Sequence, residues 1–124
     1  MYELVSIEEF EMTRFLTLKN IETGTVDICF DDSDVVSENN FSFMKRYAIY
    51  DCRIKLFGKF ANKLFKQKSA LLCTVINTSC KIGNEEFVMI KTSSEDIYYI
   101  SKSEFGNGKI KEHFYYDVGR KDLI

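Results

Sequence analysis

The fold class is decided by the segment Tyr47–Phe57, which reads YAIYDCRIKLF. Its even positions are apolar, Ala48, Tyr50, Cys52, Ile54 and Leu56, whereas its charged residues, Asp51, Arg53 and Lys55, fall on odd positions. An alternation of period two is typical of a β-strand that packs one face on a core and turns the other to solvent. We therefore expect a strand here and a mainly β protein around it.

The period changes directly after this strand. Phe60 with Leu64, and Ala61 with Phe65, are spaced i, i+4, which predicts a short amphipathic helix over residues 58–68. The following segment, residues 69–82, is apolar on both parities, as expected for a central strand covered on both faces. Turn-forming residues then separate further strands expected at 87–91, 97–100 and 110–116.

Toward the N-terminus, alternation predicts one long bent strand from about Tyr2 to Lys19, with a kink near Glu8 or Glu9. A turn at residues 20–24 leads into a second strand over residues 26–30, which makes a hairpin. The acidic run at residues 31–34 ends that strand, and it is suited to cap a short helical turn toward Met44.

The composition places the chain in the ordinary globular class. It has 124 residues, 45% of them hydrophobic and 29% charged, which predicts a single domain over residues 1–124 and excludes a disordered or fibrous protein. It has no apolar run of the ~20 residues that a membrane span needs, and no signal peptide pattern, so we expect a cytoplasmic protein without a membrane partner. The four cysteines form no C-x-x-C pair and are expected to be reduced.

In element order the chain resembles the OB-fold, a small Greek-key barrel whose helix falls between the third and fourth strands. The resemblance rests on the long N-terminal strand, the hairpin at residues 20–24, the strand at 47–57, the helix at 58–68 and the strands over 69–91. It implies a mainly β (α+β) fold: a five- to seven-stranded antiparallel OB-like barrel, or a curved sheet, with one short helix. The long connection at 31–46 and the strands after Glu95 depart from the pattern.

The net charge of −2 hides a strong segregation. Residues 1–44 carry ten acids against two bases, whereas residues 45–82 carry nine bases against one acid. Either the two blocks neutralise each other across the fold, or they form a surface with one acidic and one basic side.

The sequence contains no enzyme signature. His113, the one histidine, has no serine or cysteine at motif spacing, and the glycines match no phosphate-binding loop. The acids at residues 31–34 lack the glycine and glutamate spacing of an EF-hand, so we expect neither a metal nor a cofactor.

Two functions remain as hypotheses. The preferred one is a binding protein that has the general character of small bacterial inhibitors, as toxin-immunity proteins do. Its acidic surface would bind a basic protein partner, such as a nuclease toxin. The residues expected to make that contact are Asp31, Asp32, Asp34 and Glu38.

The alternative is an OB-like protein that binds single-stranded nucleic acid, because the segment 53–68 interleaves bases with phenylalanines. The residues expected to bind are Tyr47, Arg53, Lys55, Lys59, Lys63 and Lys66. The acidic isoelectric point of about 5.5 argues against this function, since basic domains are usual for it.

Overall fold

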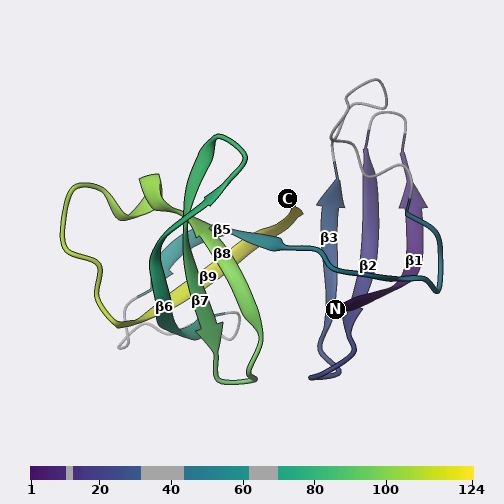
Figure 1. Ribbon diagram of the computed structural model, residues 1–124, viewed down its shortest axis with the longest axis horizontal. Coiled ribbons are helices and arrows are strands. Elements are labelled where there is room, and N and C mark those ends of the chain that lie inside the picture. The colour runs from purple at the N-terminus through teal and green to yellow at the C-terminus, as the bar shows by residue number, and fades with distance from the viewer. Residues whose placement is uncertain (11–12, 32–43, 62–69) are drawn as a thin grey trace.

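The computed structural model describes residues 1–10, 13–31, 44–61 and 70–124, and it is mainly β, as predicted (Figure 1). The strands are β1 (Tyr2–Glu9), β2 (Arg14–Asn20), β3 (Val26–Asp31), β4 (Ile49–Tyr50), β5 (Ile54–Ala61), β6 (Ala70–Ile82), β7 (Glu85–Thr92), β8 (Ile97–Ser101) and β9 (His113–Leu123). A short 3₁₀ turn, η2 (Lys102–Phe105), lies between β8 and β9.

Five of the strands close a barrel in the order β5-β8-β7-β6-β9. The ring closes because β9 is antiparallel to both β5 and β6, pairing with β6 through its first residues. Strands β6, β7 and β8 form an antiparallel meander, and β5 lies parallel to β8. This is a small OB-like barrel, and its helical turn, η2, lies between β8 and β9. The strand that completes the ring, β5, precedes the other four barrel strands in the sequence.

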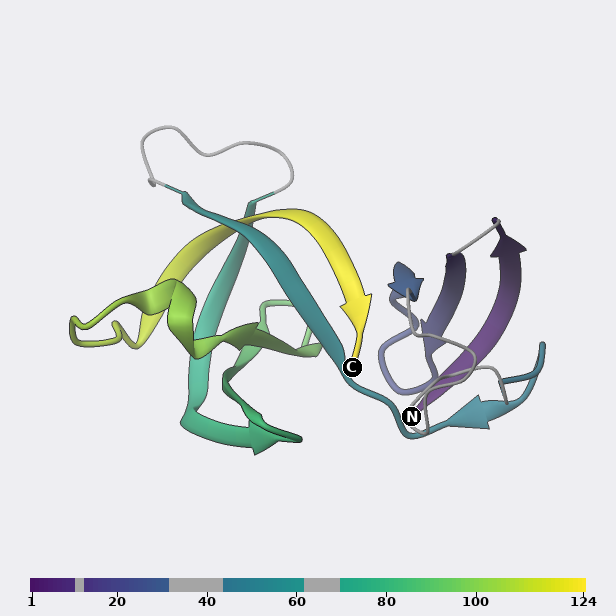
Figure 2. The same cartoon turned by 90° about the horizontal axis from the view of Figure 1, so that it is seen from above.

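The other strands form an antiparallel sheet beside the barrel, in the order β4-β1-β2-β3. One parallel pairing, Phe30 with Asp122, joins β3 to the end of β9. Figure 2 shows this N-terminal sheet to one side, with the C-terminal end of β9 at the junction. The sheet is therefore continuous with the barrel wall along β9.

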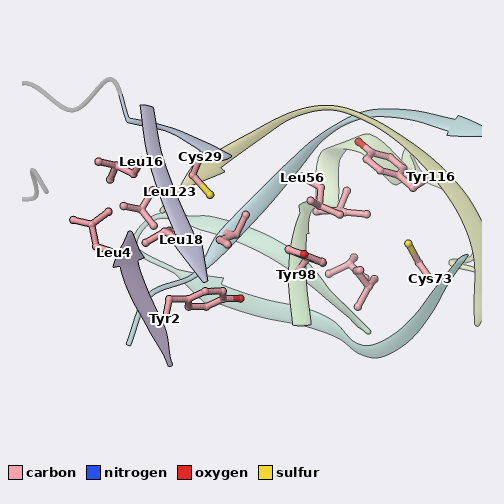
Figure 3. Close-up of a cluster of buried hydrophobic side chains, with 14 of the residues drawn as sticks. Tyr2, Leu4, Leu16, Leu18, Cys29, Leu56, Cys73, Tyr98, Tyr116 and Leu123 are labelled. Atoms are coloured by element: carbon pink, nitrogen blue, oxygen red, sulfur yellow. The ribbon is translucent and has the colours of Figure 1, made fainter. Parts of the chain in front are cut away.

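One hydrophobic cluster fills both parts (Figure 3). Leu4, Leu16 and Leu18 reach it from the N-terminal sheet, and Leu56 and Tyr116 reach it from the barrel. All five side chains are buried. The inner face of the N-terminal sheet and the barrel interior thus share one core.

The predicted long N-terminal strand is wrong: its residues form the hairpin β1–β2. The chain reverses where the amide of Phe10 donates a hydrogen bond to the carbonyl of Thr13 at 2.8 Å. Because these strands lie outside the barrel, the OB-like resemblance belongs to residues 54–123 and not to the first ninety.

The predicted helix at 58–68 is wrong in its described part, since β5 continues to Ala61 and residues 62–68 lie outside the described residues. Phe60 pairs with Tyr116 on β9, so the ladder overrides the helical spacing. The predicted strand at 47–57 is interrupted between β4 and β5. The strands predicted in the last 56 residues are confirmed as β6–β9, and β9 is longer than expected.

Candidate binding surfaces

The N-terminal sheet has one buried and one exposed face. Residues directly opposite on neighbouring antiparallel strands point to the same side of a sheet. The register therefore places Phe15 on one face with Glu8 and Phe30, and Thr17 on that face with Ile28. The outer face defined in this way holds Glu3, Ser6, Glu8, Phe15, Thr17, Lys19, Val26, Ile28, Phe30 and Ile49. Val26 and Ile28 on this face are 56% and 62% exposed, whereas Phe15 and Phe30 are half-buried.

An aromatic row runs from this outer face onto the barrel wall, made of Phe10, Phe15, Phe30, Arg120 and Phe57. The rings of Phe10 and Phe15 are 5.6 Å apart between centroids, and those of Phe15 and Phe30 are 5.5 Å apart. The guanidinium of Arg120 lies 5.0 Å from the Phe30 centroid and 5.4 Å from the Phe57 centroid. Cations at these distances from a ring face are attracted to it. The row therefore crosses β2, β3, β9 and β5 without a break.

The exposed charge of the N-terminal sheet is mostly acidic. Glu8 and Glu9 are exposed and Glu3 is half-buried. None of these three carboxylates has a salt-bridge partner among the described residues. Lys19 supplies an exposed positive charge on the same face. The outer face thus combines apolar side chains with carboxylates at its β1 edge.

A polar junction holds the N-terminal sheet against the barrel. Asp27 of β3 is 2% exposed; it accepts a hydrogen bond of 2.7 Å from the Tyr98 hydroxyl and an ion-paired hydrogen bond from Lys121 Nζ. Burying a carboxylate is costly unless donors and a counter-charge satisfy it. Burial, together with the hydrogen bond to Asp27, raises the pKa of Tyr98, so its hydroxyl stays protonated as the donor.

Asp96 forms the second half of this junction. Its Oδ1 accepts a hydrogen bond from Thr23 Oγ1 at 2.6 Å and a longer one from Asn20 Nδ2 at 3.4 Å. Its Oδ2 accepts one from Thr25 Oγ1 at 2.7 Å. The β2–β3 turn is therefore tied to the β7–β8 turn of the barrel, and this fixes the direction in which the outer face points.

The four acids predicted to bind a basic partner have different positions. Asp31 is buried, and Arg14 Nη2 lies 2.7 Å from its Oδ2. Its charge is thus engaged within the N-terminal sheet. Asp32, Asp34 and Glu38 lie outside the described residues.

Four of the six predicted nucleic-acid residues lie in the described part of the chain. Tyr47 is 70% exposed, and its amide donates a hydrogen bond to the carbonyl of Leu4 at 2.6 Å, beside β1. Arg53 and Lys59 are exposed, and Lys59 of β5 lies opposite Asp117 of β9 in the strand register. Lys55 is half-buried, with its Nζ 3.8 Å from Glu85 Oε2. Lys63 and Lys66 lie outside the described residues.

The aromatic row was missed by sequence reasoning. Arg120 and Phe57 are far apart in sequence and meet through the pairing of β5 with β9. The available signals were Phe15, which breaks the alternation of its strand, and Phe57, an apolar residue at an odd position among charged ones.

Thiol and metal chemistry receive no support from the described side chains. All four cysteines are free; burial raises the pKa of Cys52 to about 11 and of Cys73 to about 12, and it also raises the pKa of Cys29. These three thiols are therefore protonated near neutral pH. Within the described ranges, no three His, Cys, Asp or Glu side chains gather as a metal site. His113 is exposed, with its Nδ1 3.1 Å from Thr74 Oγ1.

Comparisons with protein-family models, curated proteins and solved structures find no match for this chain. No helix in the described part of the chain is long and apolar enough to cross a membrane.

Proposed function

We propose that the protein is a non-catalytic binding protein whose outer face on the N-terminal sheet docks a basic protein partner. The observation that carries this proposal is the exposure of Val26 and Ile28 on the face that also holds Glu3 and Glu8, two carboxylates without a salt bridge among the described residues. Exposed apolar surface rimmed by charge is characteristic of protein interfaces. A basic partner fits because opposite charge at the rim speeds association and excludes wrong partners.

This function is that of an inhibitor of the immunity-protein type, which acts by covering its target. The acids Asp32, Asp34 and Glu38 follow β3 in the chain and carry the same sign of charge as the outer face. They would add to the attraction of a basic target such as a nuclease. A cytoplasmic bacterial protein of this kind is expected to be encoded beside its target.

The test is a calorimetric titration with the purified product of the neighbouring gene. We expect Ile28→Thr to weaken binding at least tenfold, because a central apolar contact is lost. The double variant Glu3→Gln/Glu8→Gln should weaken binding and reduce its salt dependence in the same titration. Glu95→Gln, on a barrel turn, is the matched control and should bind normally. Unchanged affinity in the Ile28 and Glu3/Glu8 variants would contradict the proposal.

A second candidate function, binding of single-stranded nucleic acid, is favoured by the aromatic row. Rings interleaved with a guanidinium suit base stacking, which contributes about 1–3 kcal/mol per base. Fluorescence anisotropy with a labelled oligonucleotide over a salt series tests this function. This function would be favoured over protein binding by two results together. The logarithm of the binding constant should fall linearly with the logarithm of the salt concentration, and Phe30→Ser and Phe57→Ser should weaken binding.

A further inference from the structure

A pocket opens at the mouth of the barrel, well away from the outer face. Its walls come from the end of β5, from η2 and the loop that follows it, and from the start of β9. It has a volume of about 340 Å³. The residues lining it are Phe60, Ala61, Glu104, Phe105, Lys109, Ile110, Lys111, Phe114 and Tyr115. Pockets of this size hold small molecules, and the mouth of a β-barrel is a usual place for them.

The floor of this mouth pocket is aromatic and firmly held. The Phe60 ring lies edge-to-face with Phe105, Phe114 and Tyr116, at centroid distances of 5.0, 5.3 and 5.2 Å. Tyr116 is buried, and its hydroxyl accepts a hydrogen bond of 2.9 Å from the amide of Gly58. Phe60 itself remains 46% exposed. The cluster therefore offers ring surface to a ligand without rearrangement.

The rim of the mouth pocket is charged. Lys109 and Lys111 are both exposed, and neither has a salt bridge within the described part of the chain. Glu104 is the one acid among the lining residues, so the two ammonium groups leave the pocket with a net positive charge. Two lysines beside an aromatic floor repel a cationic ligand and attract an anionic one.

We propose that the mouth pocket binds a planar aromatic ring that carries a phosphate, as in a nucleotide. The ring stacks on Phe60, and the phosphate lies between Lys109 and Lys111. Stacking and charge act together here, so neither half of the ligand alone has both contacts. The same chemistry is present in a free mononucleotide and in one nucleotide of a single strand. This proposal does not rest on the proposed protein-binding function, whose face is formed by other strands.

The chain contains no tryptophan, so Phe60→Trp places one fluorescent reporter in the pocket. The probes are adenosine monophosphate, adenosine, inorganic phosphate and an eight-nucleotide oligodeoxyadenylate. We expect saturable quenching by adenosine monophosphate, with adenosine and phosphate each at least tenfold weaker. A preference of tenfold or more for the oligonucleotide assigns the site to a strand, whereas equal affinity assigns it to the free nucleotide.

Two further measurements test the proposal without the Phe60→Trp variant, in case that substitution perturbs the aromatic floor of the mouth pocket. The unsubstituted protein is titrated with adenosine monophosphate by amide chemical-shift mapping, and the shifts should concentrate in residues 104–116. Lys109→Gln with Lys111→Gln should weaken binding at least tenfold, whereas Lys81→Gln, an exposed lysine on β6, should leave it unchanged. Absence of binding at millimolar nucleotide, or binding indifferent to the loss of both rim lysines, would overturn the proposal.

Discussion

The buried carboxylate of Asp27 gives the sharpest prediction about stability. Asp27→Asn keeps the size of the side chain but removes its charge, so the ammonium group of Lys121 loses its counter-ion. Removing one partner of a buried ion pair costs about 3–5 kcal/mol. The Lys121 side chain is 27% exposed and can regain water, so we expect the loss of stability to be smaller than this range, at about 2–3 kcal/mol. At about 4 °C per kcal/mol for a chain of this size, Tm falls by about 8–12 °C.

The assay is urea unfolding followed by circular dichroism, with Tm measured in parallel. The control is Glu95→Gln, which breaks the exposed pair between Lys91 and Glu95 and should change stability by less than about 0.5 kcal/mol. Tyr98→Phe removes the other donor to Asp27, and its cost should be non-additive with that of Asp27→Asn because both act on one carboxylate. If Asp27→Asn unfolds at the same urea concentration as the control, the argument for a structural junction fails.

Two further predictions concern Gly58 of the barrel and the Cys52 thiol, which lies between β4 and β5. Gly58→Ala should destabilise the protein by about 1–3 kcal/mol, since the added Cβ would lie 2.0 Å from the carbonyl oxygen of Asp117, whereas Gly119→Ala, 3.4 Å from its nearest atom, should cost less in the same urea assay. Alkylation at pH 8 should be roughly a hundredfold slower at Cys52 than at an unperturbed thiol, because its pKa is raised from 9.0 to about 11. Since the folded state favours the protonated thiol, the contribution of Cys52 to the free energy of unfolding should be constant below pH 9 and should be lost as the pH rises through 11; rapid alkylation, or stability that stays flat above pH 9, would contradict this.

Local patterns predicted the strands β6 to β9, and the element order predicted a small barrel, but neither showed which strands close it. The turn residues around Gly83 and Glu95 mark β6, β7 and β8 because a hairpin is specified by neighbours in sequence. The ring instead depends on β9 pairing with β5 and β6, and nothing local specifies those partners. In its described part, residues 58–61, the predicted helix is wrong for the same reason: the spacing around Phe60 is helical, but eight residue pairs with β9 hold β5 as a strand.

The sequence showed how many charged residues each block holds, but not where those residues lie in the structure. None of the salt bridges among the described residues joins the acidic block at 1–44 to the basic block at 45–82. Asp27 is paired with Lys121 near the C-terminus, and Asp31 with Arg14 of its own block. A sequence cannot show that Asp27 and Asp31 are buried, because burial depends on which other strand supplies the cation.

The outer face of the N-terminal sheet is not needed to hold the fold together. The inner face already contributes Leu16 and Leu18 to the core, and no buried side-chain nitrogen or oxygen among the described residues lacks a hydrogen-bond partner. Threonine suits a strand as well as valine or isoleucine does. Val26→Thr with Ile28→Thr should therefore leave the free energy of unfolding within about 0.5 kcal/mol of its original value while it weakens binding to the basic partner. A large loss of stability would instead show that the two side chains serve the fold, and the docking face would have to be sought elsewhere.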